Sequence, residues 1–186
     1  MKELATMNHN HLGYTLLEIL VAMTIIASVG ILITQVFFTT TRTNTKSELL
    51  KDVKQNGDFA VESMTRMIRN SFGVDSDCTA EGTALNYIQI RNPDGIDTTF
   101  GCVADGSVTR IASTSASSTS SDYLTSSNVT LGGTDCPSSS LQFTCTSFAG
   151  QPSKISIQFQ LSQTGVPVDQ FEKASTSFET VVSPRN

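Results

Sequence analysis

The stretch that decides the fold of this chain is GYTLLEILVAMTIIASVGILITQVFF, residues 13–38. Within residues 16–38 it contains one charged residue, Glu18. About 20 consecutive apolar residues are long enough to cross a bilayer as a helix. A secretory signal peptide has a shorter apolar core with a small-residue cleavage site after it, and no such site follows this stretch. We therefore predict a membrane-spanning helix that the mature protein keeps.

An amphipathic helical pattern follows the apolar stretch directly. Its apolar residues recur at three- and four-residue steps and are Leu50, Val53, Gly57, Ala60, Met64 and Ile68, with Leu49, Val61 and Met67 widening the stripe. Charged residues lie between them, as expected for a helix with one buried face. Because no proline occurs before Pro93, we predict one helix over residues 14–70, capped near Gly73. Such a helix would be on the order of 85 Å long.

Short alternating runs separated by turns follow the helix and indicate β-structure. The predicted strands are 85–91, 98–103, 107–111, 140–148 and 154–161, with a final edge strand around Phe171, Phe178, Val181 and Val182. Residues 92–95 and 104–106 are predicted turns. The Ser- and Thr-rich segment 112–130 is predicted to be a flexible surface loop, ending in a short strand at 129–131. The expected fold class is α+β: a long N-terminal helix, transmembrane in its first half, with an antiparallel sheet of about four to six strands packed on its second half.

The composition argues against several classes of function. The net charge is −5, whereas a general nucleic-acid binder needs a basic patch to meet phosphates. No G-x-S-x-G motif occurs, and both histidines, His9 and His11, lie close to the N-terminus. We therefore expect no catalytic site, no cofactor, no nucleic-acid partner and no small-molecule substrate.

The four cysteines, Cys78, Cys102, Cys136 and Cys145, include no C-x-x-C pair, which argues against zinc. An even number of cysteines in an exported chain predicts two disulfides. Three pairings are possible, and we favour Cys78–Cys102 with Cys136–Cys145 because each closes a short loop. The alternative is four free thiols in a reducing compartment.

The residues GYTLLE, 13–18, resemble the cleavage and methylation signal of type IV pilins and of the pseudopilins of type II secretion. The pattern in that family is Gly, an aromatic residue that is usually Phe, Thr, Leu, an aliphatic residue and Glu, and here Tyr14 replaces Phe. The resemblance covers about residues 13–38. It implies that a membrane peptidase cuts after Gly13 and N-methylates Tyr14. It also implies that Glu18 pairs with the N-terminal amine of a neighbouring subunit, which fits the cost of an unpaired carboxylate in an apolar segment, about 2.5 kcal/mol or more.

The resemblance also implies a domain organisation and a location. Residues 1–13 would be the leader peptide, 14–38 the transmembrane or filament-core half of the helix, 39–73 its amphipathic half, and 74–186 a β-rich globular domain. The charge rule alone would place that domain inside the cell, because basic residues follow the apolar stretch. The motif and the cysteines instead predict a single-pass protein of the inner membrane with an exported C-terminal domain, assembled into a surface pilus or a periplasmic pseudopilus.

The leading hypothesis for function is a structural subunit, a minor pilin or pilin-like protein, of a type IV pilus. Its expected partners are the prepilin peptidase, other pilin subunits and the inner membrane. One alternative is a minor pseudopilin of a type II secretion system. Another is a single-pass membrane anchor that carries a β-rich binding module and never polymerises.

Some pseudopilins bind calcium through loop carboxylates, so Asp94 and Asp97 in the predicted turn are the candidate metal ligands here. Their spacing does not match an EF-hand loop, which needs a run of oxygen ligands and a distal Glu. We therefore predict a solvated hairpin turn and no metal site.

Overall fold

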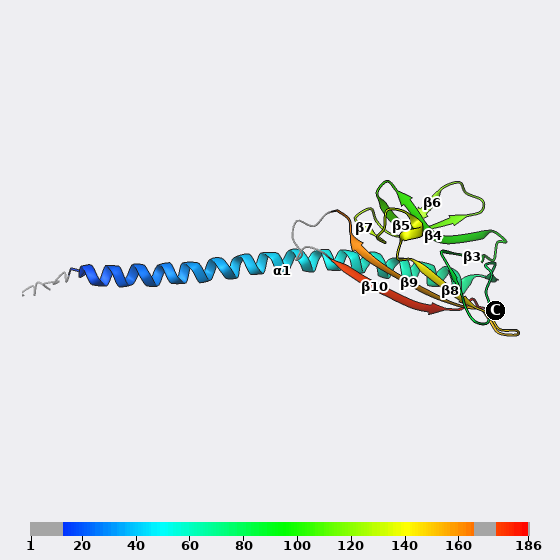
Figure 1. Ribbon diagram of the computed structural model, residues 1–186, viewed down its shortest axis with the longest axis horizontal. Helices are drawn as coiled ribbons and strands as arrows, with labels where there is room; N and C mark the ends of the chain where they lie inside the picture. Colours follow the sequence, from blue (N-terminus) through cyan, green and yellow to red (C-terminus); the bar gives the residue numbers. More distant parts are fainter. Residues whose placement is uncertain (1–12, 166–173, 186) are drawn as a thin grey trace, which may run out of the picture. The chain divides into compact units, whose positions relative to one another are not determined.

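A computed structural model describes residues 13–165 and 174–185. The chain divides into two compact units, residues 1–43 and 44–186. Helix α1, Leu16–Asn70, begins in the first unit and ends in the second (Figure 1). The prediction of one continuous helix reaching residue 70 is confirmed. The predicted leader up to residue 12 and the predicted strand position Phe171 lie outside the described residues.

Serine, and not glycine, ends helix α1. The Ser71 backbone N–H donates to the Ile68 carbonyl at 3.2 Å, and the Ser71 hydroxyl donates to the same oxygen at 2.7 Å. These bonds satisfy a carbonyl that the end of the helix would otherwise leave without a partner. Gly73 has no positive φ and begins the first strand, so the prediction that it caps the helix is wrong.

Ten strands, counted within the described residues, form two antiparallel sheets of five (Figure 1). The strands of the first sheet, in spatial order, are β1 (Gly73–Val74), β3 (Tyr87–Arg91), β4 (Asp97–Asp105), β5 (Val108–Ser115) and β6 (Ser121–Tyr123). The second contains β10 (Ser175–Val182), β9 (Lys154–Gln163), β8 (Gln142–Thr146) and β2 (Thr83–Leu85) in that order, with β7 (Val129–Thr130) also paired to β9. The α+β class and the final edge strand are confirmed, but there are two sheets where we expected one.

The segment 112–130, predicted to be a flexible loop, is partly β-structure. It contains the end of β5, all of β6, and β7. The hydroxyls of Thr114 and Ser121, which lie opposite each other on β5 and β6, hydrogen-bond at 2.8 Å. Arg110 donates to the Thr125 carbonyl through Nε at 2.9 Å. The prediction failed because polar contacts, and not an apolar alternation, order this segment.

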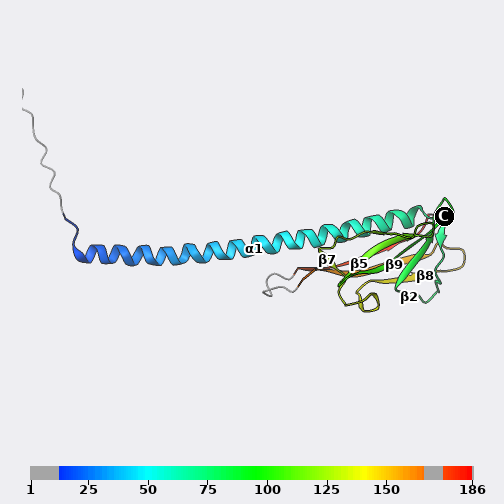
Figure 2. The ribbon, with the colours of Figure 1, turned by 90° about the horizontal axis from the view of Figure 1, so that it is seen from above.

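Unit 44–186 has its core between the second half of α1 and the two sheets, whose strands lie on one side of that half (Figure 2). The helix buries the predicted stripe from Val53 onward, whereas Leu50 stays 42% exposed. The sheets contribute fully buried side chains from both inner faces. They are Ile88, Ile90, Phe100 and Ile111 from the first sheet, and Phe143, Ile155, Ile157 and Leu161 from the second.

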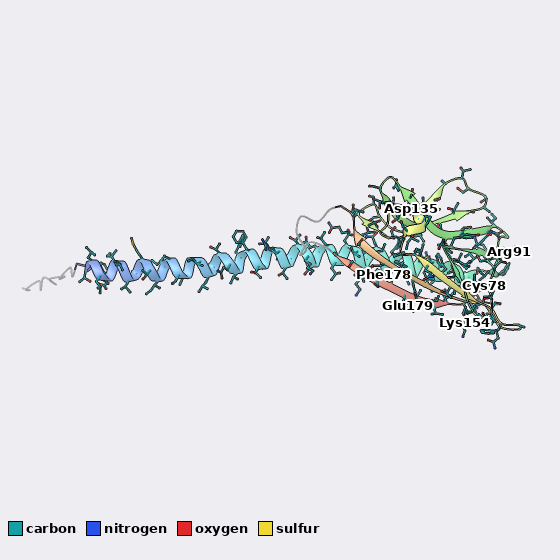
Figure 3. All side chains as sticks on the ribbon, viewed as in Figure 1. Cys78, Arg91, Asp135, Lys154, Phe178 and Glu179 are labelled. Atoms are coloured by element: carbon teal, nitrogen blue, oxygen red, sulfur yellow. A yellow bond between two sulfur atoms is a disulfide. The ribbon has the colours of Figure 1, made fainter. Side chains whose placement is uncertain are left out.

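Helix α1 lies close to β10 at Gly57. A Cβ atom there would overlap the ring of Phe178, which projects from β10 (Figure 3). That ring is stacked on Phe159, with the ring centroids 5.1 Å apart. Gly57 is therefore required by packing.

We expect Gly57→Ala to destabilise the protein by about 1–2 kcal/mol. Overpacking of this kind costs about 1–3 kcal/mol, and the better helix propensity of alanine offsets at most about 1. The measurement is thermal unfolding of the full chain in detergent. In a Phe178→Leu background, which leaves room for the methyl group, the same substitution should cost less. Equal stability of the parent and Gly57→Ala proteins would contradict this account.

Two disulfides, Cys78–Cys145 and Cys102–Cys136, use all four cysteines. Their Cα–Cα distances are 5.0 and 5.4 Å. The predicted pairing is therefore wrong. The prediction paired the cysteines that are nearest in sequence. The structure instead pairs them by position in the fold, with Cys102 on β4 of the first sheet and Cys145 on β8 of the second. The segment that carries Cys78 lies beside β8, where Thr79 forms a bridge with Thr146.

Candidate functional site

Thr15 caps the N-terminus of α1, directly before the apolar segment. Its side-chain oxygen accepts a hydrogen bond from the Glu18 backbone N–H at 3.2 Å, and its carbonyl accepts from the N–H groups of Glu18 and Ile19. A threonine three residues before a glutamate is the sequence signature of a capping box. Thr15 was not predicted to cap the helix, although the spacing of Thr15 and Glu18 could have indicated that cap. The cap makes the helix begin at Leu16 and places Glu18 in its first turn.

The bond between Gly13 and Tyr14 lies just outside the helix, in a segment without regular structure. Both residues are exposed, and no atom of the described chain lies within 4 Å of a Cβ placed on Gly13. A peptidase must bind its substrate in an extended form, and glycine permits the closest approach to the backbone. The predicted cleavage site is therefore accessible in the folded chain.

The apolar part of α1 has no cover within the described residues. No residue of the helix before Val53 is buried, and Leu16 and Leu17 are 83% and 75% exposed. By length and composition the helix is able to cross a membrane, with its most apolar window wholly exposed. A helix that is apolar all round and exposed needs lipid or other protein to cover it. This segment therefore has the properties of an anchor or of an assembly surface.

The hydroxyl groups in the apolar segment are already satisfied by the helix itself. Thr24 and Ser28 donate to the carbonyls of Val21 and Ile25, three residues earlier, and Thr34 donates to Gly30, each at 2.8 Å. Such internal bonds let polar side chains lie in an apolar environment. These residues therefore do not require a partner from outside the helix.

Glu18 differs from these residues. Among the residues that the structure describes, its carboxylate has no cationic neighbour and accepts no hydrogen bond. The positive end of the helix dipole favours an acidic residue in the first turn, by about 0.3–1 kcal/mol in water. That is less than the cost of an unpaired carboxylate in lipid, about 2.5 kcal/mol or more at a helix centre. Burial of this segment therefore requires a cationic or hydrogen-bonding partner for Glu18 from outside the described residues.

The candidate metal ligands Asp94 and Asp97 lie in the β3–β4 hairpin and have protein partners. Asp94 Oδ1 accepts a bond from the Ile96 N–H at 2.9 Å, and Gly95 takes the positive φ of 80° that the turn requires. Asp97 pairs with Arg91 at 3.4 Å. The predicted hairpin turn is confirmed. Nowhere in the described part of the chain do three His, Cys, Asp or Glu residues gather as a metal-binding group.

Arg91 also pairs with Asp75, at 2.5 Å, and so joins the segment after the helix to the hairpin. The pKa of Arg91 lies above its usual value, chiefly because of the negative charge of Asp75. Both arginine contacts are partly exposed to solvent, where such pairs contribute little to stability. This cluster is therefore structural and leaves the N-terminal segment as the candidate site.

Comparison with protein families supports that choice. Residues 8–34 match the family model described as the prokaryotic N-terminal methylation motif. No curated protein and no solved structure matches the chain significantly. The matched residues include the exposed Gly13–Tyr14 bond, the Thr15 cap and Glu18. The N-terminal segment of this chain is therefore a prokaryotic N-terminal methylation motif, the prepilin-type signal of type IV pilin-like proteins.

Proposed function

We propose that this protein is a structural subunit of a type IV pilus, and specifically a minor pilin. The observation that carries the proposal is an exposed apolar helix that overlaps an N-terminal methylation motif and contains Glu18, which has no partner among the described residues. In an assembled filament, neighbouring helices would cover the apolar surface, and the N-terminal amine of one subunit would pair with the Glu18 of the next. The motif supports a pilin-like or pseudopilin role in assembly rather than in catalysis.

In this proposal the prepilin peptidase removes residues 1–13 and methylates the amine of Tyr14. Residues 14–38 then hold the subunit in the inner membrane until it enters the filament. The β-rich part of the chain is exported, which is supported by its two disulfides because such bonds persist in oxidising compartments.

The proposal of a minor role follows from features of the β-rich part of the chain. The two disulfides and the Ser- and Thr-rich segment 112–130 support a specialised subunit more than an abundant one, which must pack against copies of itself. The ratio of this protein to the most abundant pilin in sheared filaments tests the minor role. Its presence in secretion pseudopili, and its absence from surface pili, would favour the pseudopilin alternative.

Gly13→Leu should block removal of the leader, because its side chain fills the space that the peptidase needs at the Gly13–Tyr14 bond. Intact mass spectrometry of the chain co-expressed with a prepilin peptidase should show the leader retained and the Tyr14 amine unmethylated. Gly30→Leu is the matched control, since Gly30 also has open space around its Cα and lies far along the helix from the bond. The proposal fails if Gly13→Leu yields the same mature N-terminus as the parent, or if the parent is not cut.

A further inference from the structure

A small cavity lies against strands β3, β4 and β5 of the first sheet. Its volume is about 330 Å³. Register places Tyr87 on β3, Gly101 on β4 and Ala112 on β5 side by side in one row across the three strands. Because alternate residues of a strand point to opposite faces, this row faces away from the buried Phe100 and Ile111.

The floor of the cavity consists of the small residues Gly101 and Ala112, and Tyr87 stands at one side. The Tyr87 side chain is 55% exposed, so its ring is available to a ligand. A Cβ atom on Gly101 would lie 3.3 Å from the Cβ of Tyr87, so any side chain at this position would enter the space beside the ring. The absence of a side chain at Gly101 therefore keeps one face of the cavity open.

Cys136 and Pro137, from the short 3-10 helix η1 (Cys136–Ser138), form another wall of the cavity. The disulfide to Cys102 ties this helix to β4. A capping box fixes its start, with the Ser138 N–H donating to Asp135 Oδ1 at 3.1 Å (Asp135 is labelled in Figure 3). The Ser138 hydroxyl, its strongest contact, holds the pKa of Asp135 below its usual value. The wall is thus positioned before any ligand arrives, which lowers the entropic cost of binding.

Polar groups line the cavity next to the Tyr87 ring. Thr99 and Thr114 lie opposite each other in the adjoining row, and Asn86 precedes Tyr87. Within the described chain, the side chains of Asn86, Tyr87 and Thr99 have no hydrogen-bond partner. The cavity therefore offers one aromatic face, the hydroxyl of that same tyrosine, and two further uncharged hydrogen-bonding side chains.

We propose that this cavity binds a neutral oligosaccharide. A sugar ring has an apolar C–H face that packs on an aromatic ring and a rim of hydroxyls that pair with amides and hydroxyls. No residue that lines the cavity is charged. A wholly apolar ligand would leave the three polar groups unpaired, at a cost for each.

Other classes of ligand fit the cavity less well. A nucleic acid requires free cations, but the arginines on this face of the sheet, Arg91 and Arg110, are both paired with aspartates. A proline-rich peptide uses a groove lined by several aromatic rings, and Tyr87 is the one aromatic residue in the lining. The proposal goes beyond the structural role in a filament and does not depend on it.

The test uses the full chain in lipid nanodiscs and calorimetric titration with maltotriose, cellotriose and triacetylchitotriose. We expect at least one of these neutral trisaccharides to bind. Tyr87→Ala should weaken that binding by about tenfold, equivalent to about 1.4 kcal/mol, and Gly101→Val should weaken it by filling the floor. Tyr87→Phe, which keeps the ring, should retain most of the affinity.

Phe148→Ala is the matched control, because Phe148 is similarly exposed at 49% but does not line the cavity. It should bind as the parent does, and thermal unfolding should show that each variant is folded. The proposal is overturned if none of the three sugars binds, or if Tyr87→Ala and Phe148→Ala bind equally. It is also overturned if a decaproline peptide or oligo-deoxythymidine binds in their place. Sugar binding is measured on single chains in nanodiscs and requires no filament. The outcome of this test is therefore independent of whether the protein assembles into filaments.

Discussion

Replacing Glu18 with alanine is expected to abolish incorporation of the protein into filaments while leaving it in the membrane. Glu18 is the one charged residue of the apolar segment and has no partner among the described residues. Its removal should not hinder membrane insertion, because a carboxylate in an apolar segment opposes insertion. Assembly should nevertheless be lost, because the neighbouring subunit's N-terminal amine would then be buried without a counter-charge. The measurement is the amount of protein in sheared filaments relative to the membrane fraction.

Gln35→Ala provides the control for this experiment, since Gln35 is a polar but uncharged residue of the same helix. It should assemble as the parent does, and Glu18→Asp should restore part of the assembly that Glu18→Ala loses. If Glu18→Ala enters filaments normally, the carboxylate has no role in assembly. If the parent itself never enters a filament, the chain is better described as a single-pass membrane anchor.

The second large effect is expected from removing the Cys78–Cys145 disulfide. These cysteines are 67 residues apart, and a cross-link over such a loop stabilises a protein by about 4 kcal/mol through the unfolded state. That is a large share of the roughly 5–15 kcal/mol by which domains are stable. We therefore expect the double variant Cys78→Ala with Cys145→Ala to unfold at a much lower denaturant concentration. Cys145 is fully buried, so alanine is preferred to serine there.

The second disulfide supplies the matched comparison. Cys102 and Cys136 are 34 residues apart, and halving a loop changes its closure entropy by only about 0.6 kcal/mol. Their double alanine variant should therefore lose nearly as much stability, and it should also release the wall of the cavity. Peptide mapping without reduction identifies which cysteines are joined. Recovery of a Cys78–Cys102 peptide, or equal stability of parent and variants, would contradict the structure.

Local patterns in the sequence were enough to predict the N-terminal half of the protein. The apolar segment, the amphipathic stripe from Val53 to Ile68 and the helix end at residue 70 depend on contacts between residues three or four apart. The methylation motif is likewise a short run, and its residues 13–18 could be identified without a structure. The T-x-x-E cap at Thr15 was present in that same run, although no cap was predicted there.

The rest depended on which strands meet, and that is set by contacts between residues far apart in the sequence. One sheet became two, and polar contacts between β5 and β6 organised the segment that composition indicated was a loop. The pairing of the cysteines is set by which strands are neighbours and not by the shortest loops. Cys145 on β8, for example, pairs with Cys78 because β8 lies beside β2 and the segment that carries Cys78. The row of Tyr87, Gly101 and Ala112 likewise exists only because three strands pair in one register.

The sequence by itself therefore determined the long apolar helix, because a helix forms from contacts between residues close together in the chain. An exposed apolar helix then needs lipid or other protein to cover it. The sequence also placed the one charge, Glu18, that such a helix cannot bury alone. Only the tertiary structure decided the disulfide pairs, the two sheets and the cavity beside Tyr87. Each of these joins residues that are distant in the chain, and a change of one position in strand register would place their side chains on the opposite face of the sheet.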